Sequence, residues 1–165
     1  MDATADAYER LVALLDAEGA RYRVIEHAPE GRSEIVSALR GHHARESAKC
    51  IVLMVKVGKK VTRFVLAVVP GDSRVDFEAI QRRTNATSVR FAEKSLAESL
   101  AGSVSGTILP FPFDPRLELL VDTAVAASTT MYFNAGRLNR SLALDTKDYL
   151  RIARPEVLPI AVPPG

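Results

Sequence analysis

A lysine stands directly in front of the most apolar segment of the chain. Lys49 precedes residues 50–57, whose sequence CIVLMVKV is rich in β-branched and other apolar side chains. A lysine at the mouth of a buried strand can direct its ammonium group into a cleft and bind a phosphate or a carboxylate. The plainer interpretation is a solvated lysine at a strand end, since lysine is rarely buried unless it is paired. Position alone makes Lys49 a candidate binding residue and leaves both interpretations open.

The loop GTILP, residues 106–110, is the second candidate. Gly106 permits a positive φ or a close approach of the backbone to a ligand. Pro110 removes one N–H donor and stiffens the loop. Such a loop can present backbone N–H groups to a carbonyl or to a developing oxyanion. An ordinary turn between a helix and a strand has the same pattern, so the loop alone does not identify a site.

The remaining reactive side chains give little sign of a metal or of covalent catalysis. Cys50 opens an apolar strand, which favours a small buried hydrophobic residue over a nucleophile. The histidines at positions 27, 42 and 43 lack the cysteine or carboxylate spacing of a zinc site. Walker, dinucleotide-binding and G-x-S-x-G motifs are absent from the sequence. We therefore expect no metal, no cofactor and no serine triad.

Strands and short helices must position these residues. Residues 50–57 and 61–69 are joined by Gly58-Lys59-Lys60, which is typical of a β-hairpin, and their apolar character indicates strands covered on both faces. Helices are expected at residues 5–18, 33–39, 73–83, 93–100 and 146–152. Further strands are expected at residues 21–26, 88–91, 117–122, 130–134 and 142–144. This order predicts an α+β (mixed α/β) fold with helices inserted between hairpins.

Composition limits the function classes. The chain has 165 residues, 47% apolar and 25% charged, so we expect one domain over residues 1–165 with a proline-bearing irregular arm at 153–165. A single cysteine excludes an internal disulfide and favours a reducing compartment. The sequence has no apolar run of about 18 residues and no secretory signal pattern, so we expect a cytoplasmic protein without a membrane segment. The net charge of +2 permits nucleic-acid binding without requiring it.

Five segments in chain order carry a family resemblance: AKCIVLMVKV, FVLAVVPGD, GTILP, LLVDTAV and MYFNAGRLNRSLALD. By their order and spacing, the chain from its first helix to Ile152 resembles the YbaK domain. That domain is also the editing insertion of bacterial prolyl-tRNA synthetases and is found as free-standing trans-editing deacylases. The resemblance implies a central mixed, mostly antiparallel sheet or partial barrel surrounded by helices.

The resemblance also implies an activity, the hydrolysis of the ester between a small amino acid and the 3′ end of a mischarged tRNA, often tRNA for proline. It implies no cofactor and no covalent intermediate. Lys49 would act at the terminal adenosine or its phosphate, and the backbone from Gly106 to Pro110 would hold the ester carbonyl or the amino group. The implied substrate-binding residues are Cys50, Thr107, Ile108, Leu109, Asp122, Asn134, Gly136 and Ser141. The implied partners are the 3′ end of aminoacyl-tRNA and, as an open option, an aminoacyl-tRNA synthetase.

One departure from the family leaves an alternative open. Prolyl-synthetase insertions carry a histidine, and YbaK an aspartate, at the position that aligns with Ser141, and a serine is a poor general base unless activated. A catalytically inactive module that binds aminoacyl-tRNA or a small molecule is therefore the alternative function. Residues 30–46 correspond to a variable helix that tunes specificity, although Arg32, Arg40 and Arg45 are equally consistent with a solvated charged face.

Overall fold

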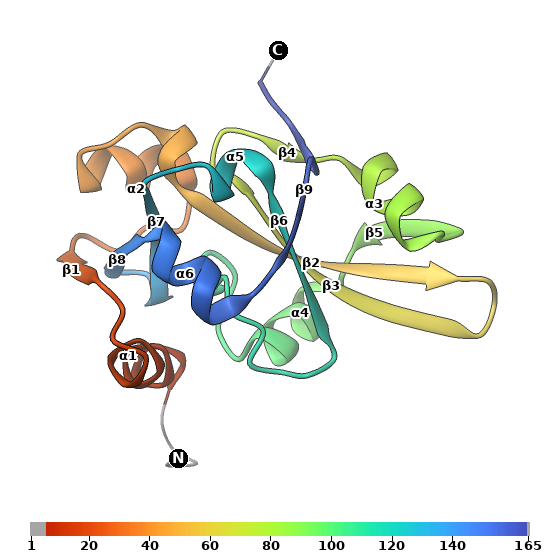
Figure 1. Cartoon of the computed structure of the whole chain (residues 1–165), viewed down its shortest axis with the longest axis horizontal. Helices are drawn as coiled ribbons and strands as arrows, with labels where there is room; N and C mark the ends of the chain where they lie inside the picture. Colours follow the sequence, from red (N-terminus) through yellow and green to blue (C-terminus); the bar gives the residue numbers. More distant parts are fainter. Residues whose placement is uncertain (1–5, 165) are drawn as a thin grey trace.

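The computed structural model describes residues 6–164 and arranges them as three sheets with short helices packed around them (Figure 1). The helices are α1 (Ala7–Ala17), α2 (Ser33–Arg40), α3 (Phe77–Thr84), α4 (Lys94–Ala101), α5 (Thr123–Ala126) and α6 (Thr146–Ala153), with a 3₁₀ turn η1 (Ala44–Glu46). The strands are β1 (Tyr22–Glu26), β2 (Ala48–Val57), β3 (Val61–Pro70), β4 (Arg74–Val75), β5 (Ser88–Phe91), β6 (Leu117–Asp122), β7 (Thr130–Arg137), β8 (Arg140–Asp145), β9 (Glu156–Leu158) and β10 (Ala161–Val162). The predicted α+β class is confirmed. None of the helices within residues 6–164 is long and apolar enough to cross a bilayer.

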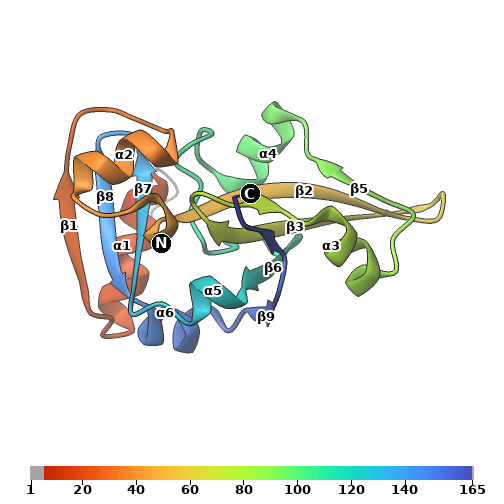
Figure 2. The same cartoon turned by 90° about the horizontal axis from the view of Figure 1, so that it is seen from above.

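The central sheet has the strand order β5-β2-β3-β6-β9, and the predicted β2–β3 hairpin lies at its middle. The β2–β3 and β2–β5 pairs are antiparallel, whereas β6 runs parallel to β3 and to β9. Side chains alternate between the two faces, so Val52 packs with Leu100 of α4 and Leu53 packs with Ile80 of α3. Figure 2 shows α4 on one side of this sheet and α3 and α5 on the other. Both faces of the hairpin are therefore covered, as predicted.

The second sheet is antiparallel, with the order β1-β8-β7, and it packs against α1. Leu11 and Leu15 of α1 are fully buried in the same cluster as Phe133 of β7. An isolated parallel bridge between Ser47 and Tyr132 joins this sheet to the start of β2. The two sheets therefore meet one residue before β2, and α2 lies beside β7 at this junction (Figures 1 and 2).

The C-terminal segment differs from the irregular arm expected over residues 153–165. After α6, β9 extends the central sheet beside β6, and β10 pairs with β4. Ile160 between them is completely buried, and its N–H donates to Oδ1 of Asp122 at 2.9 Å. The prolines keep these strands short, but burial of one apolar side chain and a carboxylate acceptor anchor the segment to the fold.

Candidate active site

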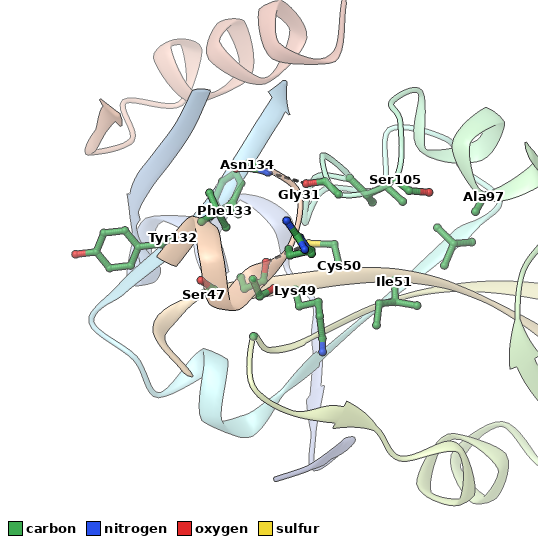
Figure 3. Close-up of a pocket in the computed structure, with 18 of the residues that line it drawn as sticks. Gly31, Ser47, Lys49, Cys50, Ile51, Ala97, Ser105, Tyr132, Phe133 and Asn134 are labelled. Atoms are coloured by element: carbon green, nitrogen blue, oxygen red, sulfur yellow. Dashed lines mark hydrogen bonds between the residues drawn. The ribbon is translucent and has the colours of Figure 1, made fainter. Parts of the chain in front are cut away.

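A cavity of about 460 Å³ opens at the junction of the two sheets (Figure 3). Five of the residues predicted for the site line it: Lys49 and Cys50 of β2, Gly106 and Ile108 of the loop before β6, and Asn134 of β7. The fold thus brings together three segments that are far apart in the sequence. The volume lies within the range of about 300–1,000 Å³ that is usual for small-molecule sites.

Lys49 is half-buried in the cavity wall. Its Nζ donates to the carbonyl oxygen of Ser73 at 2.5 Å, and no second hydrogen bond of Nζ is found within residues 6–164. Burial lowers the pKa of Lys49, and the nearby carboxylates of Glu34 and Asp72 oppose that shift. An ammonium group has three N–H donors, so two of them are available to a ligand.

The Gly106 loop packs backbone to backbone against Gly31. Gly106 has a φ of +88°, and a Cβ atom at this position would lie 3.0 Å from the Cα of Gly31. The hydroxyl and the N–H of Thr107 both donate to the carbonyl of Val104, which tightens the turn. In the part of the chain that the structure describes, the N–H groups of Gly106 and Ile108 have no hydrogen-bond acceptor. Two backbone donors therefore stand beside the cavity.

The other residues predicted from this loop lie outside the cavity. Thr107 and Leu109 are buried on the core side, and Leu109 packs in the cluster that contains Phe133. The carbonyl of Pro110 accepts a hydrogen bond from the hydroxyl of Tyr149 at 2.7 Å. Gly106 and Ile108 therefore line the cavity, whereas Thr107, Leu109 and Pro110 support the loop from behind.

Asn134 cross-links the segments that surround the cavity. Its Nδ2 donates to the carbonyl oxygens of Glu30 at 2.7 Å and Gly106 at 2.9 Å. Its Oδ1 accepts from Nη2 of Arg40 and from the hydroxyl of Ser141, both at 3.0 Å. Both ends of the amide are used, so an asparagine fits this position and an aspartate would lack the two donors.

Arg40, the last residue of α2, was named from the sequence only as part of a variable helix, yet it lines this cavity. Its Nε donates to the hydroxyl of Ser141 at 2.8 Å and its Nη1 to the hydroxyl of Ser47 at 3.1 Å. Burial lowers the pKa of Arg40 to about 10, so it stays charged at neutral pH. Ser47 could not be named from the sequence, because a serine before a strand matches no motif.

Three other predicted residues lie outside the cavity. Ser141 is completely buried behind Asn134, and its hydroxyl lies 2.6 Å from Nε2 of His27. Gly136 lies at a β-bulge of β7, where α1 approaches the backbone closely. Asp122 accepts hydrogen bonds from the N–H groups of Ala124, at the start of α5, and of the C-terminal segment. Its carboxylate therefore serves the fold, and nothing in its position supports the expected contact with substrate.

The thiol of Cys50 is an apolar part of the wall. Burial raises the pKa of Cys50, and its Sγ has only a long contact of 3.8 Å with the carbonyl of Ala48. Only the thiolate is nucleophilic, so this cysteine is unsuited to covalent catalysis. Within residues 6–164, no three His, Cys, Asp or Glu side chains converge on a point where a metal ion could bind.

Comparison with known proteins agrees with this geometry. Residues 27–152 match the family model described as the aminoacyl-tRNA editing domain. Over 152 residues, which are 92% of this chain and 90% of the relative, the sequence is 38% identical to the Multifunctional Ser/Thr-tRNA deacylase ProXp-y of Escherichia coli (strain K12).

Two solved structures share the fold at lower identity. The crystal structure of hypothetical protein APE2540 has a TM-score of 0.84 at 21% identity and covers 93% of this chain and 100% of its own. The crystal structure of a candidate trans-editing enzyme for prolyl tRNA synthetase has a TM-score of 0.77 at 18% identity, and the match covers 97% of this chain and 99% of that structure's chain. The family model and the 38% identical relative confirm the family resemblance, and the chain belongs to the family of aminoacyl-tRNA editing domains.

Proposed function

We propose that this protein is a trans-editing deacylase that hydrolyses the ester bond of tRNA mischarged with serine or threonine. The observation that carries the proposal is the 38% identity, over 92% of this chain, with a deacylase named for Ser- and Thr-tRNA. Membership of the editing family supports the reaction class. The cavity supports it as well, since it combines a cationic side chain with free backbone donors. The proposed compartment is the cytoplasm, where aminoacyl-tRNA is used.

Lys49 is proposed to bind the 3′-terminal adenosine through its phosphate. Two donors of its ammonium group are available, and a compact cation suits a phosphate oxygen. The N–H groups of Gly106 and Ile108 are proposed to hold the ester carbonyl, because fixed backbone donors stabilise the charge that develops on that oxygen.

The apolar wall of the cavity is suited to the small side chain of the bound amino acid. Cys50 and Ile108 pack in one cluster with the buried Ala97 and Val52, and all four line the cavity. This wall is apolar and closely backed by the central sheet and α4. We propose that it limits the side chain of the bound amino acid to a small one.

The proposal is tested by deacylation of tRNA charged with Ser, Thr, Ala, Cys, 2-aminobutyrate or Pro, using the native protein, Lys49→Ala and Lys147→Ala. Lys147 is exposed on α6 and serves as the matched control. We expect selective release of Ser and Thr by the native protein and the control. For Lys49→Ala we expect kcat/KM to fall about 100-fold, which corresponds to about 2.7 kcal/mol of transition-state stabilisation.

Two results would contradict different parts of this proposal. Absence of release from every tRNA by the native protein would refute the deacylase and favour the inactive binding module. Full activity of Lys49→Ala would refute only the role of Lys49. A synthetase partner remains a prediction, and gel filtration with prolyl-tRNA synthetase and tRNA-Pro would test it by co-elution.

A further inference from the structure

Arg40 brings a positive charge to the cavity without a carboxylate partner among residues 6–164. Arg32, which also lines the cavity, differs in this respect because Glu30 binds its Nε at 2.9 Å and its Nη2 at 3.0 Å. Among residues 6–164, the guanidinium of Arg40 donates hydrogen bonds only to the neutral side-chain oxygens of Ser47, Asn134 and Ser141. A charge withdrawn from water without a counter-ion is unfavourable, so this arrangement is suited to an anion that arrives from outside.

The three contacts leave part of the guanidinium free. An arginine has five N–H donors, and Nε, Nη1 and Nη2 of Arg40 each give one to the protein. One donor on Nη1 and one on Nη2 therefore remain. The oxygens that hold the group belong to residues that are 0–6% exposed, so the plane of the guanidinium is fixed before a ligand binds. Fixed donors need no reorganisation when charge develops beside them.

Asn134 ties this guanidinium to the Gly106 loop. Nη2 of Arg40 lies 3.0 Å from the Oδ1 of Asn134, and the Nδ2 of the same amide lies 2.9 Å from the carbonyl oxygen of Gly106. Arg40 and the loop are thus linked through the single amide group of Asn134. Figure 3 shows Asn134 beside Gly31 at one end of the cavity, with Cys50 and Lys49 along β2. An ester oxygen bound at the loop would lie near the free donors of Arg40.

We propose that Arg40 is a catalytic residue that donates hydrogen bonds to the carbonyl oxygen of the aminoacyl ester as that oxygen becomes negatively charged. This inference rests on the proposed function. Water adds to the carbonyl carbon, and the π electron pair of the C=O bond moves onto oxygen. The C=O bond then re-forms, and the bond to the ribose oxygen breaks with its electron pair. One proton of the water ends on the ribose oxygen and the other is released as the amino acid carboxyl ionises, while Arg40 keeps its own protons.

The experiment compares two ligands that differ in charge and shape at the position of the reacting carbon. The first is 3′-seryl-amido-3′-deoxyadenosine, which has a neutral planar carbonyl. The second is the matching adenosine phosphonate, which has a tetrahedral anionic group. Affinities are measured by calorimetry for the native protein, Arg40→Lys and Arg82→Lys, the last being an exposed control on α3.

We expect the native protein and Arg82→Lys to bind the phosphonate at least about 30-fold more tightly than the amide. Arg40→Lys should lose this preference, because lysine keeps a charge but not the forked donors, while its affinity for the amide changes less than about threefold. Its kcat on Ser-tRNA should fall about 100-fold at a nearly unchanged KM, as for loss of an oxyanion donor. Thermal unfolding monitored by circular dichroism verifies that each variant is folded.

Other outcomes would overturn the proposal. Equal weakening of both ligands would assign Arg40 a merely structural role. A third ligand, the amide with a 5′-phosphate, tests whether Arg40 binds the terminal phosphate instead. If the 5′-phosphate no longer strengthens binding to Arg40→Lys while the preference for the phosphonate is intact, Arg40 lies at the terminal phosphate and the proposal is refuted. If Arg40→Lys does not fold, Ser47→Ala, which removes one of the three contacts, should reduce the phosphonate preference, and an unchanged preference would refute the proposal. Arg40→Lys with native kcat would refute the role of Arg40 alone, whereas inactive native protein would refute the proposed function.

Discussion

Replacement of Gly106 by alanine should disturb both the stability and the cavity, and Gly58→Ala is its matched control. Both glycines have positive φ, +88° and +65°, where an L-residue costs about 1–2 kcal/mol. A Cβ at Gly58 would have nothing within 4 Å, whereas one at Gly106 would lie 3.0 Å from the Cα and 3.4 Å from the carbonyl oxygen of Gly31.

The difference between the two variants measures the contact between the loops. Insertion of a methyl group into a packed region costs about 1–3 kcal/mol. Before the effect of alanine on the unfolded chain is counted, we therefore expect the free energy of unfolding to fall by about 1–2 kcal/mol for Gly58→Ala and by about 2–5 kcal/mol for Gly106→Ala. The opposing effect of alanine on the unfolded chain, about 0.4–1 kcal/mol, is common to both variants and cancels in the comparison.

Gly106→Ala and Gly58→Ala should also differ in their deacylation rates. When a methyl group moves Gly106 away from Gly31, it strains the two hydrogen bonds from Asn134 that join these loops. A displacement of about 1 Å near a reacting group can reduce a rate about 100-fold. We expect Gly106→Ala to lose between about 10- and 100-fold in kcat on Ser-tRNA, and Gly58→Ala, at the tip of the β2–β3 hairpin, to keep the native rate.

Urea unfolding followed by circular dichroism gives the free energies, and release of labelled serine gives the rates. If the two variants are equally stable within about 0.5 kcal/mol and equally active, the loops are not in tight contact and the reasoning is refuted.

Three further predictions concern residues around the cavity. Asp122→Ala should lower the free energy of unfolding by about 3 kcal/mol or more in a urea titration, because three backbone N–H groups lose a buried carboxylate acceptor; a loss below about 1 kcal/mol would contradict that role. Tyr149→Phe should cost about 1–2 kcal/mol in the same assay, since the buried carbonyl of Pro110 loses its donor, and an unchanged stability would show that this bond contributes nothing. Because burial raises the pKa of Cys50, its alkylation by iodoacetamide should keep increasing above about pH 8.5, where the alkylation of an ordinary thiol levels off. Cys50→Ala should still hydrolyse Ser-tRNA because the thiol takes no covalent part in the reaction, and an alkylation plateau at about pH 8.5 would contradict a raised pKa.

Local patterns in the sequence were sufficient to predict most of the elements, although α5, β9 and β10 were not predicted and the helix expected at residues 73–83 begins only after β4. The β-branched segments on either side of Gly58-Lys59-Lys60 form the β2–β3 hairpin, with Val57 paired to Val61 as a three-residue turn requires. Helices α1 and α4 begin and end within two residues of the predicted bounds. These features depend on side-chain periodicity and turn residues that are neighbours in the chain, so they can be read without knowledge of the tertiary structure.

The structure of the C-terminal segment and the role of Asp122 could not be predicted from local sequence patterns. Prolines after α6 correctly excluded a further helix, but they carried no information on the burial of Ile160 or on pairing beside β6. Asp122 ends a strand next to a small-residue turn, which suits a ligand contact and a structural acceptor equally well. Only the fold, which brings residues 160–161 to its carboxylate, decides between them.

Some residues of the candidate site could likewise be named from the sequence, and others only from the fold. Lys49 and the Gly106 loop could be named from the sequence, because a cation before an apolar strand and a glycine-proline loop are visible in the chain itself. The fold alone decided that Gly106 and Ile108, rather than Pro110, line the cavity. It also decided that Arg40 lies there without a carboxylate partner among residues 6–164, because its partners Ser47, Asn134 and Ser141 come from separate segments. Hydrogen-bond partners distant in sequence leave no periodic signal, so they become visible only when the segments are placed in space.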